Sequence, residues 1–479
     1  MENKSLRNKT FLGLVWTSIE KSGQLVIQFV VGVLLSRQLS PEDYGTMGMI
    51  AIFIAISSVI IESGFGSALI QKKDRNEDDY STCFYFNVLV GVLLYLILWF
   101  TSSLIADFYD TPILCDIVKV SGLALMLNSF CVSQVAKMRS EMRFKEIMIV
   151  TLATRLLSGI GALTMAYMGY GVWSLVFQQV CFGAVYFLSI EICMRWYPKL
   201  SFSVNSFKHL FSFGSKLLCS SLLNTICNNI YALVIGKFFS VSHVGYYSRA
   251  NGYAQLPSNT LMYTVMKVAY PVLSEIQDEE QRLRAAYMKF LRMSAFLLCP
   301  VISCLIVLAK PFIVVLIGDK WLPVVPLFQI LCVGAFFEPL NQLNLNVLYV
   351  KGRTDLVLKL EIIKKPVAFV LLFATIPLGL KWICVGQSLY GFIAYCINCY
   401  YTGKYLDLGL LKQMRTNLPI MFNSFVMGLL CYCCLFLFES LSLQLIGGFL
   451  MGGISYLFIA YKAKDESFFD LKNIVKRIF

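Results

Sequence analysis

The stretch QLVIQFVVGVLLSRQLSPEDYGTMGMIAIFIAISS (24–58) decides the fold class, because two apolar runs flank one short polar turn. A helix needs about 20 apolar residues to cross the ~30 Å hydrocarbon core of a bilayer. The turn is too short to hold a domain, and Arg37 is its one basic residue. The stretch therefore predicts a hairpin of two transmembrane helices.

Comparable apolar runs follow one another along the whole chain of 479 residues. Hydrophobic residues make up 58% and charged residues 14%, whereas a globular domain has about 25% charged residues. The longest hydrophilic connection, near 270–286, holds no domain. We expect an all-α polytopic membrane protein with about fourteen transmembrane helices. The runs lie near 10–35, 43–70, 81–106, 113–136, 147–168, 171–194, 210–236, 243–266, 287–309, 321–350, 357–378, 381–403, 417–438 and 441–461.

Basic residues are distributed unevenly between alternate connections. Cytoplasmic connections of bacterial membrane proteins are enriched in Lys and Arg. Clusters such as Lys72–Lys73 and Lys137–Arg139 alternate with connections that hold single cations, such as Arg37 and Lys237. This alternation predicts a multi-pass protein of the bacterial inner membrane with both termini in the cytoplasm. The net charge of +13 lies in short clusters between apolar runs, which excludes a nucleic-acid-binding surface.

An internal repeat relates residues 24–58 to residues 224–258 without a gap, at an offset of 200. In this alignment Arg37 is equivalent to Lys237, and Gly45 is equivalent to Gly245. Six spans separate the copies, so both have the same orientation, as in transporters built from two parallel halves. We expect pseudo-symmetric six-helix lobes at 1–208 and 209–415, followed by two more helices and a cytoplasmic tail at 416–479.

Six motifs, in order, carry a resemblance to a known family. They are LLSRQLSPEDYGTMGMI (34–50), AKMRSEMRFKEI (136–147), GYGVWSLVFQQV (169–180), VGYYSRANGYAQLP (244–257), LAKPFIVVLIGDKW (308–321) and LYVKGRTD (348–355). They resemble the polysaccharide transporter family, the Wzx-like O-antigen and exopolysaccharide flippases of the MOP (MATE-like) superfamily.

The resemblance implies a flippase rather than an enzyme. Such proteins move oligosaccharide repeat units on undecaprenyl pyrophosphate from the inner to the outer leaflet by alternating access. The implied use is the synthesis of a surface polysaccharide: O-antigen, capsule or exopolysaccharide. We expect a monomer among membrane lipids, with a polysaccharide polymerase as a candidate partner and no cofactor or metal.

Four cations at membrane depth are candidate contacts for the pyrophosphate: Lys21, Arg155, Lys216 and Arg249. A charged side chain in the hydrocarbon core costs about 2.5–3.5 kcal/mol on insertion scales and is a functional hypothesis by default. Lys and Arg supply the charge-assisted contacts that phosphates require. The alternative is that these long side chains reach the headgroup layer and serve no ligand.

Acidic, amide and aromatic residues add further candidates. Glu62 and Glu338 are candidates for coupling to H⁺ or Na⁺, or else neutral carboxyls that stabilise helix packing. Asn224 and Asn228 share one helix face and, with Tyr253, are candidates for contact with sugars. The alternative for the amides is hydrogen bonding between helices.

Several other functions compete with this interpretation. The closest is a lipid II flippase or another exporter of the superfamily. In a different class, a membrane polysaccharide polymerase usually has one long outer loop, which this chain lacks. An acyltransferase usually has a membrane-embedded His, whereas His209 and His243 lie near span ends. The closely spaced Cys396 and Cys399 are interpreted as small apolar residues of a helix rather than a metal site.

Overall fold

The structure is a computed structural model that describes residues 2–62, 64–72 and 74–478. The side chains of 2–11, 213, 216, 474–475 and 477–478 are not part of that description. Within the described residues, regular structure consists of seventeen α-helices and two short 3₁₀ helices, with no strand. The predicted all-α class is therefore confirmed.

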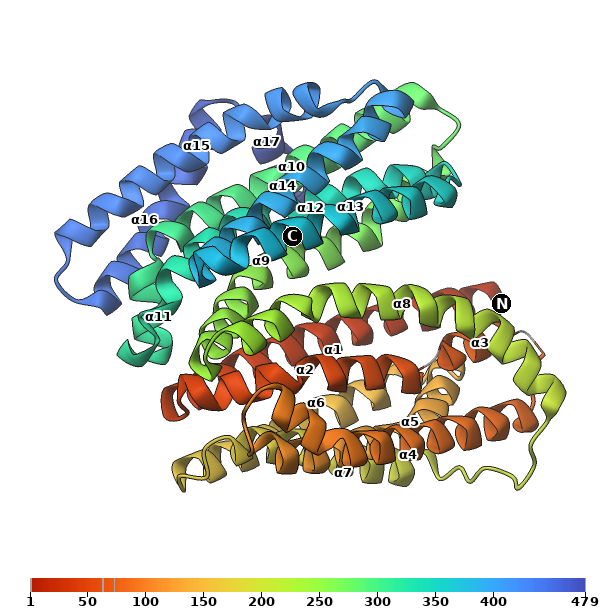
Figure 1. Ribbon diagram of the computed structural model, residues 1–479. Helices are drawn as coiled ribbons and strands as arrows, with labels where there is room; N and C mark the ends of the chain where they lie inside the picture. The colour runs from red at the N-terminus through yellow and green to blue at the C-terminus, as the bar shows by residue number, and fades with distance from the viewer. Residues whose placement is uncertain (1, 63, 73, 479) are drawn as a thin grey trace. The chain divides into compact units, whose positions relative to one another are not determined.

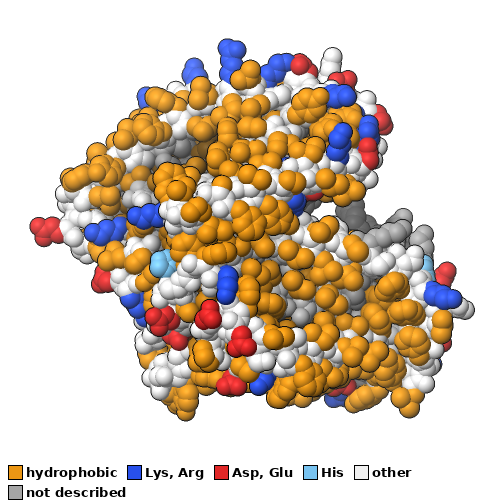
Figure 2. All heavy atoms as spheres, in the orientation of Figure 1, with side chains coloured by type: hydrophobic (Ala, Val, Ile, Leu, Met, Phe, Trp, Pro, Cys, Tyr) orange, Lys and Arg blue, Asp and Glu red, His pale blue; other side chains and the backbone are white. Residues whose placement is uncertain are grey.

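Fourteen of these helices, all but the short α3, α11 and α17, have 22 residues or more, and each coincides with one predicted run. Among the described residues, twelve spans are long and apolar enough to cross a membrane. The two long helices outside that set are α9 and α13. They carry charged residues such as Arg249 and Lys267 in α9 and Glu361 and Lys364 in α13. Hydrophobic side chains cover most of the face drawn in Figure 2, as lipid contact requires.

Contacts divide the chain into two units, Met1–Gly245 and Tyr246–Phe479. The lobes predicted at 1–208 and 209–415 were defined by the internal repeat and not by contacts. The division into these lobes stays a prediction. Helix α8, which the repeat assigns to the second lobe, packs on α2 inside the N-terminal unit. The N-terminal unit contains α1 (Glu2–Gln38), α2 (Pro41–Glu62), α3 (Phe65–Gln71), α4 (Glu77–Phe108), α5 (Leu114–Ser140), α6 (Phe144–Tyr167), α7 (Trp173–Met194) and α8 (Val204–Phe238).

Within the N-terminal unit, α5 packs between α4 and α7, and α6 packs between α1 and α7 (Figure 1). The second predicted run, 43–70, is broken into α2 and α3. Gly64 adopts φ 69°, a left-handed conformation that glycine adopts at little cost. The break separates Glu62, the last residue of α2, from α3.

The turns of the two repeat copies meet inside this unit. A Cβ added to Gly45 would lie 1.9 Å from the carbonyl oxygen of Val241, and one added to Gly245 would lie 1.9 Å from that of Pro41. The Ser242 hydroxyl also donates to Glu42, at 3.2 Å. Residues 41 and 42 are the offset-200 equivalents of 241 and 242, so the two turns contact each other through equivalent positions.

The C-terminal unit holds most of α9 (Val241–Glu275) and all of the later helices. Helix α12 packs on α10 and α14, α13 on α14, and α15 on α10 and α16. Outside the spans, Lys412 and Arg284 lower the pKa of Asp407 by pairing with it. The later helices are α10 (Glu280–Val307), α11 (Ala309–Ile317), α12 (Val324–Val350), α13 (Thr354–Thr375), α14 (Leu380–Leu406), α15 (Leu410–Leu437), α16 (Leu441–Lys462) and α17 (Glu466–Ile478).

Candidate functional site: a charged cavity in the N-terminal unit

A cavity of about 680 Å³ lies inside the N-terminal unit, lined by residues of α1, α2, α3, α5, α6, α7 and α8. This volume is in the usual range of small-molecule sites, about 300–1,000 Å³. Five charged residues are part of the lining: Glu20, Lys21, Glu62, Arg139 and Arg155. Three of them, Lys21, Glu62 and Arg155, are among the residues predicted from the sequence.

Arg155 enters the cavity from α6. Ile147, Thr151 and Arg155 all line it, and their spacing of four residues places them on one helix face. The guanidinium carbon lies 4.9 Å from the ring centroid of Phe182 on α7, a cation–π arrangement. Phe182 in turn stacks on Tyr186, with ring centroids 5.4 Å apart and planes 12° from parallel. The Arg155 Nε is buried and has no hydrogen-bond partner among the described residues.

Helix α1 contributes both signs of charge. Lys21 and its neighbour Glu20 line the cavity, although adjacent residues point about 100° apart on a helix. The Gln24 side-chain amide donates to Glu20 Oε1 at 2.9 Å. Glu20 is not among the site residues predicted from the sequence.

None of the five charged residues takes part in an ion pair within 4 Å among the described residues. Unpaired charges are costly in an apolar environment. The lining also includes polar side chains such as Gln24, Asn128 and Thr151. The cavity is therefore suited to water or to a polar, charged ligand.

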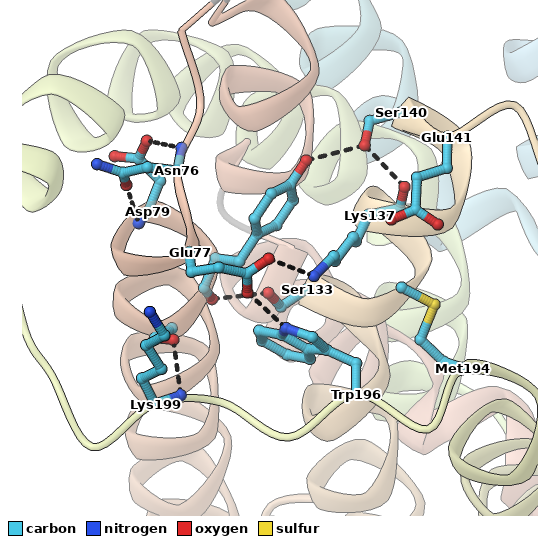
Figure 3. Close-up of polar contacts among 12 residues, drawn as sticks. Asn76, Glu77, Asp79, Ser133, Lys137, Ser140, Glu141, Met194, Trp196 and Lys199 are labelled. Carbon is cyan, nitrogen blue, oxygen red and sulfur yellow. Dashed lines mark hydrogen bonds and ion pairs between the residues drawn. The ribbon is translucent and has the colours of Figure 1, made fainter.

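A neighbouring cluster on the same unit is fully paired and serves as a contrast (Figure 3). Lys137 Nζ donates to Glu77 at 2.6 Å, and the Trp196 indole N–H donates to the other oxygen of Glu77 at 2.7 Å. The Lys137 ammonium also lies 5.0 Å from the Trp196 ring centroid and 5.3 Å from that of Tyr80. These contacts hold the connection between α7 and α8 against the start of α4. We interpret this cluster as structural.

The other predicted site residues with described side chains are not among the residues that line the cavity. Asn224 and Asn228 lie exposed on α8, and the side chain of Lys216 lies outside the described residues. Arg249 and Tyr253 belong to the part of α9 in the C-terminal unit. Arg249 is half-buried, and the buried Tyr253 ring meets Phe312 edge-on, with centroids 6.1 Å apart.

Glu338, the last predicted residue, lies on α12, where Gln342 donates to it at 3.4 Å. This contact joins two residues one turn apart on the same helix. Among the described residues, Glu338 thus forms a hydrogen bond within its own helix and no ion pair. Its coupling role stays a prediction.

Comparison with known proteins gives a family match and full-length relatives. Residues 34–326, more than half of the chain, match the family model described as "Polysaccharide biosynthesis protein". The chain is 26% identical to the teichuronic acid biosynthesis protein TuaB of Bacillus subtilis, over 97% of each chain. It is 25% identical to the lipopolysaccharide biosynthesis protein WzxC of Escherichia coli, over 75% of this chain and 74% of that one.

Solved structures share the fold. The lipid II flippase MurJ, in an inward closed conformation, superposes with a TM-score of 0.77 at 17% identity, covering 95% of this chain and 99% of that one. An inward-facing multidrug resistance MATE family transporter of the MOP superfamily gives a TM-score of 0.64 at 14% identity, covering 85% of this chain and 98% of that one. These likenesses confirm the predicted fold.

Proposed function

Because the chain belongs to the polysaccharide biosynthesis protein family, we propose that it is a flippase for lipid-linked oligosaccharides. It carries repeat units on undecaprenyl pyrophosphate from the inner to the outer leaflet of the bacterial inner membrane, for a surface polysaccharide. The names of the relatives support this proposal, since one is a lipopolysaccharide biosynthesis protein and another is a succinoglycan biosynthesis transport protein. The observation that carries it is the cavity between apolar helices, whose charged residues form no ion pair among the described residues.

The proposed transport requires no covalent chemistry. A charged, hydroxyl-rich head group loses its hydration when it leaves water, and fixed cations and hydrogen-bonding groups must replace that hydration. Lys21 and Arg155 line the cavity and are suited to this role; Lys216 and Arg249 are proposed for it from their place in the sequence. A site that bound the head group in one conformation only would trap it, so we expect Arg249 to serve the pyrophosphate at a different stage from the cavity residues.

Coupling and partners are further parts of this proposal. Glu62 lines the cavity and is the candidate for H⁺ or Na⁺ coupling there, with Glu338 as the candidate in the C-terminal unit. The protein would work as a monomer beside a polysaccharide polymerase. Both termini would face the cytoplasm.

Topology is testable by reporter fusions. Fusions after Arg37, Phe108 and Leu380 should report a periplasmic position, and fusions after Arg143 and Lys412 a cytoplasmic one. The reason is that Lys- and Arg-rich connections remain inside. A consistent reversal from any point onward would show that a helix there does not cross the membrane.

Function is testable in a strain that lacks the gene. We expect surface polysaccharide to disappear, lipid-linked repeat units to accumulate on the cytoplasmic side, and the wild-type gene to restore export. Unchanged surface polysaccharide together with arrested peptidoglycan synthesis would instead identify a lipid II flippase. Normal synthesis of both would contradict the flippase proposal.

A further inference from the structure

We infer that α17, the last helix of the C-terminal unit, binds anionic phospholipid. The binding surface consists of Phe469, Lys472 and Lys476, which we call the basic face of α17, and its ligand is the phosphate of the headgroup. The inference is independent of the proposed flippase activity, since it requires only that α16, one of the apolar spans, crosses the membrane.

The connection between α16 and α17 places α17 at the membrane surface. Helix α16 ends at Lys462. The backbone N–H of Asp465 donates to the carbonyl oxygen of Ala460 at 3.0 Å. The Asp465 carboxylate accepts the backbone N–H of Ser467 at 2.8 Å and so caps the start of α17. These bonds hold the start of α17 beside the last turn of α16, where the hydrocarbon core meets the headgroups.

Aromatic side chains gather at this junction. The ring centroids of Phe468 and Phe469 lie 6.1 and 6.3 Å from that of Tyr461, in the last turn of α16. Tyr461 and Phe469 are exposed. Exposed aromatic rings at the end of a membrane span are typical of the headgroup layer, where an apolar ring and a polar group are both accommodated.

The acidic residues of α17 are paired with cations of α10. Arg292 pairs with Glu466 and also lies 3.8 Å from a carboxylate oxygen of Asp465. Lys289 pairs with Asp470 at 2.9 Å. These contacts direct the negative charge of α17 toward α10, so that it does not face the lipid headgroups.

The lysines of α17 lie on a different side of the helix. Lys472 is two residues from Asp470, which corresponds to roughly 200° around the helix axis. Phe469, Lys472 and Lys476 are spaced by three and four residues and therefore share one face. Both lysines are exposed and form no ion pair among the described residues. The basic face thus presents positive charge beside an aromatic ring, the combination that attaches interfacial helices to anionic lipid.

Anionic phospholipid is the occupant that these observations favour. The basic face lies next to the headgroup layer, where lipid phosphates are the nearest anions. Each lysine near such a surface strengthens binding to anionic lipid by about fivefold. An acidic soluble protein would pair with the lysines as well, but it gives no reason for an exposed aromatic ring beside the end of a membrane span.

Hydrogen exchange tests the inference on the full-length protein in lipid nanodiscs. One set of nanodiscs contains phosphatidylcholine alone, and the other contains phosphatidylcholine mixed with phosphatidylglycerol. The measured quantity is the exchange rate of the α17 backbone amides, which falls when lipid holds the helix in place. We expect phosphatidylglycerol to slow this exchange by about tenfold or more, and high salt to remove most of the slowing. Equal rates in the two lipids would overturn the inference.

A double variant attaches the lipid effect to the basic face. In Lys472→Gln/Lys476→Gln most of the slowing by phosphatidylglycerol should be lost, because two contributions of about fivefold each are removed. Lys359→Gln/Lys404→Gln is the matched control, since these two lysines are also exposed and form no ion pair among the described residues. The control should keep the full slowing. Full slowing in the α17 variant, or an equal loss in the control, would show that the basic face does not bind the lipid.

Arg292→Gln separates lipid binding from helix packing. Arg292 pairs with acidic residues of α17 and not with its basic face. We expect faster exchange of the α17 amides in both lipids, because the helix loses contacts with α10, while the ratio of the rates in the two lipids stays within about twofold of the wild type. If the lipid effect disappears in Arg292→Gln and persists in the double lysine variant, the phospholipid binds α10 and the inference is wrong.

Discussion

The buried polar groups of the C-terminal unit and the charged residues of the cavity in the N-terminal unit have different partners. In the C-terminal unit, Asn344 and Gln413 are buried and exchange hydrogen bonds of 2.9 and 3.3 Å, while the Tyr395 hydroxyl donates to Gln413 at 3.0 Å. Lys364 is buried and pairs with Glu361 at 2.5 Å. In the N-terminal unit, the five charged residues of the cavity are in no ion pair among the described residues.

This difference separates structural charges from available ones. A satisfied polar network inside a protein rigidifies it and fixes how its helices pack. A charge outside an ion pair is only partly compensated by contacts such as those of Arg155 with Phe182 and of Glu20 with Gln24, and it remains available to a ligand or water. The buried polar groups of the C-terminal unit thus have the partners expected of groups that stabilise helix packing. We therefore expect changes in the cavity to alter export, and changes in the paired set to alter stability.

The largest effect is expected from removing two cavity cations together, in Lys21→Ala/Arg155→Ala. Two lost charge-assisted contacts of about 1.5–3 kcal/mol each correspond to a loss of export of about 100-fold or more. The measurement is surface polysaccharide in the deletion strain that carries the variant, divided by the amount of variant protein in the membrane. Normal export from a well-expressed double variant would mean that the cavity charges serve no cargo.

A smaller effect of a different kind is expected from Gln413→Leu. The change removes the donor to the Asn344 Oδ1 and the acceptor of the Tyr395 hydroxyl, and a buried unsatisfied polar group costs about 1–3 kcal/mol. We expect a lower unfolding temperature in detergent, while export per molecule of folded protein stays within about twofold of the wild type. Gln281→Leu, at an exposed position on α10, is the control for a polar-to-apolar change. Loss of export without loss of stability would place Gln413 among the functional residues.

The sequence predicted the helices well, because span length and loop charge are local properties. All fourteen long helices coincide with predicted runs. The repeat also anticipated that Gly45 and Gly245 are equivalent. It did not predict that the two turns would touch, with each glycine facing a carbonyl of the other turn, because an alignment relates positions without placing them in contact.

The composition of the cavity was predictable only in part. Lys137 and Arg139 are two residues apart on α5, and both were assigned to a basic cytoplasmic connection. Two residues correspond to roughly 200° around a helix, so the side chains point in different directions: Lys137 meets Glu77 and Trp196, and Arg139 lines the cavity. Which direction faces a cavity depends on the neighbouring helices, and a single sequence does not contain that information.

The smallest effect is expected from Lys364→Ala, which tests the paired side of the comparison. Lys364 is buried in α13 beside Glu361, but Glu361 also lies 3.4 Å from Lys365. Removal of Lys364 therefore leaves the carboxylate with a second cation and avoids the cost of an isolated buried charge. Export per molecule should be unchanged, and the unfolding free energy should fall by about 1 kcal/mol or less.

The double variant Lys364→Ala/Lys365→Ala should lose more stability than the two single variants combined, because only the double variant leaves Glu361 without a partner. Strictly additive losses would mean that the two lysines do not share the carboxylate. A loss of export in Lys364→Ala at full stability would mean that a locally paired membrane charge can still serve the cargo, and pairing would then not distinguish structural from functional charges in this protein.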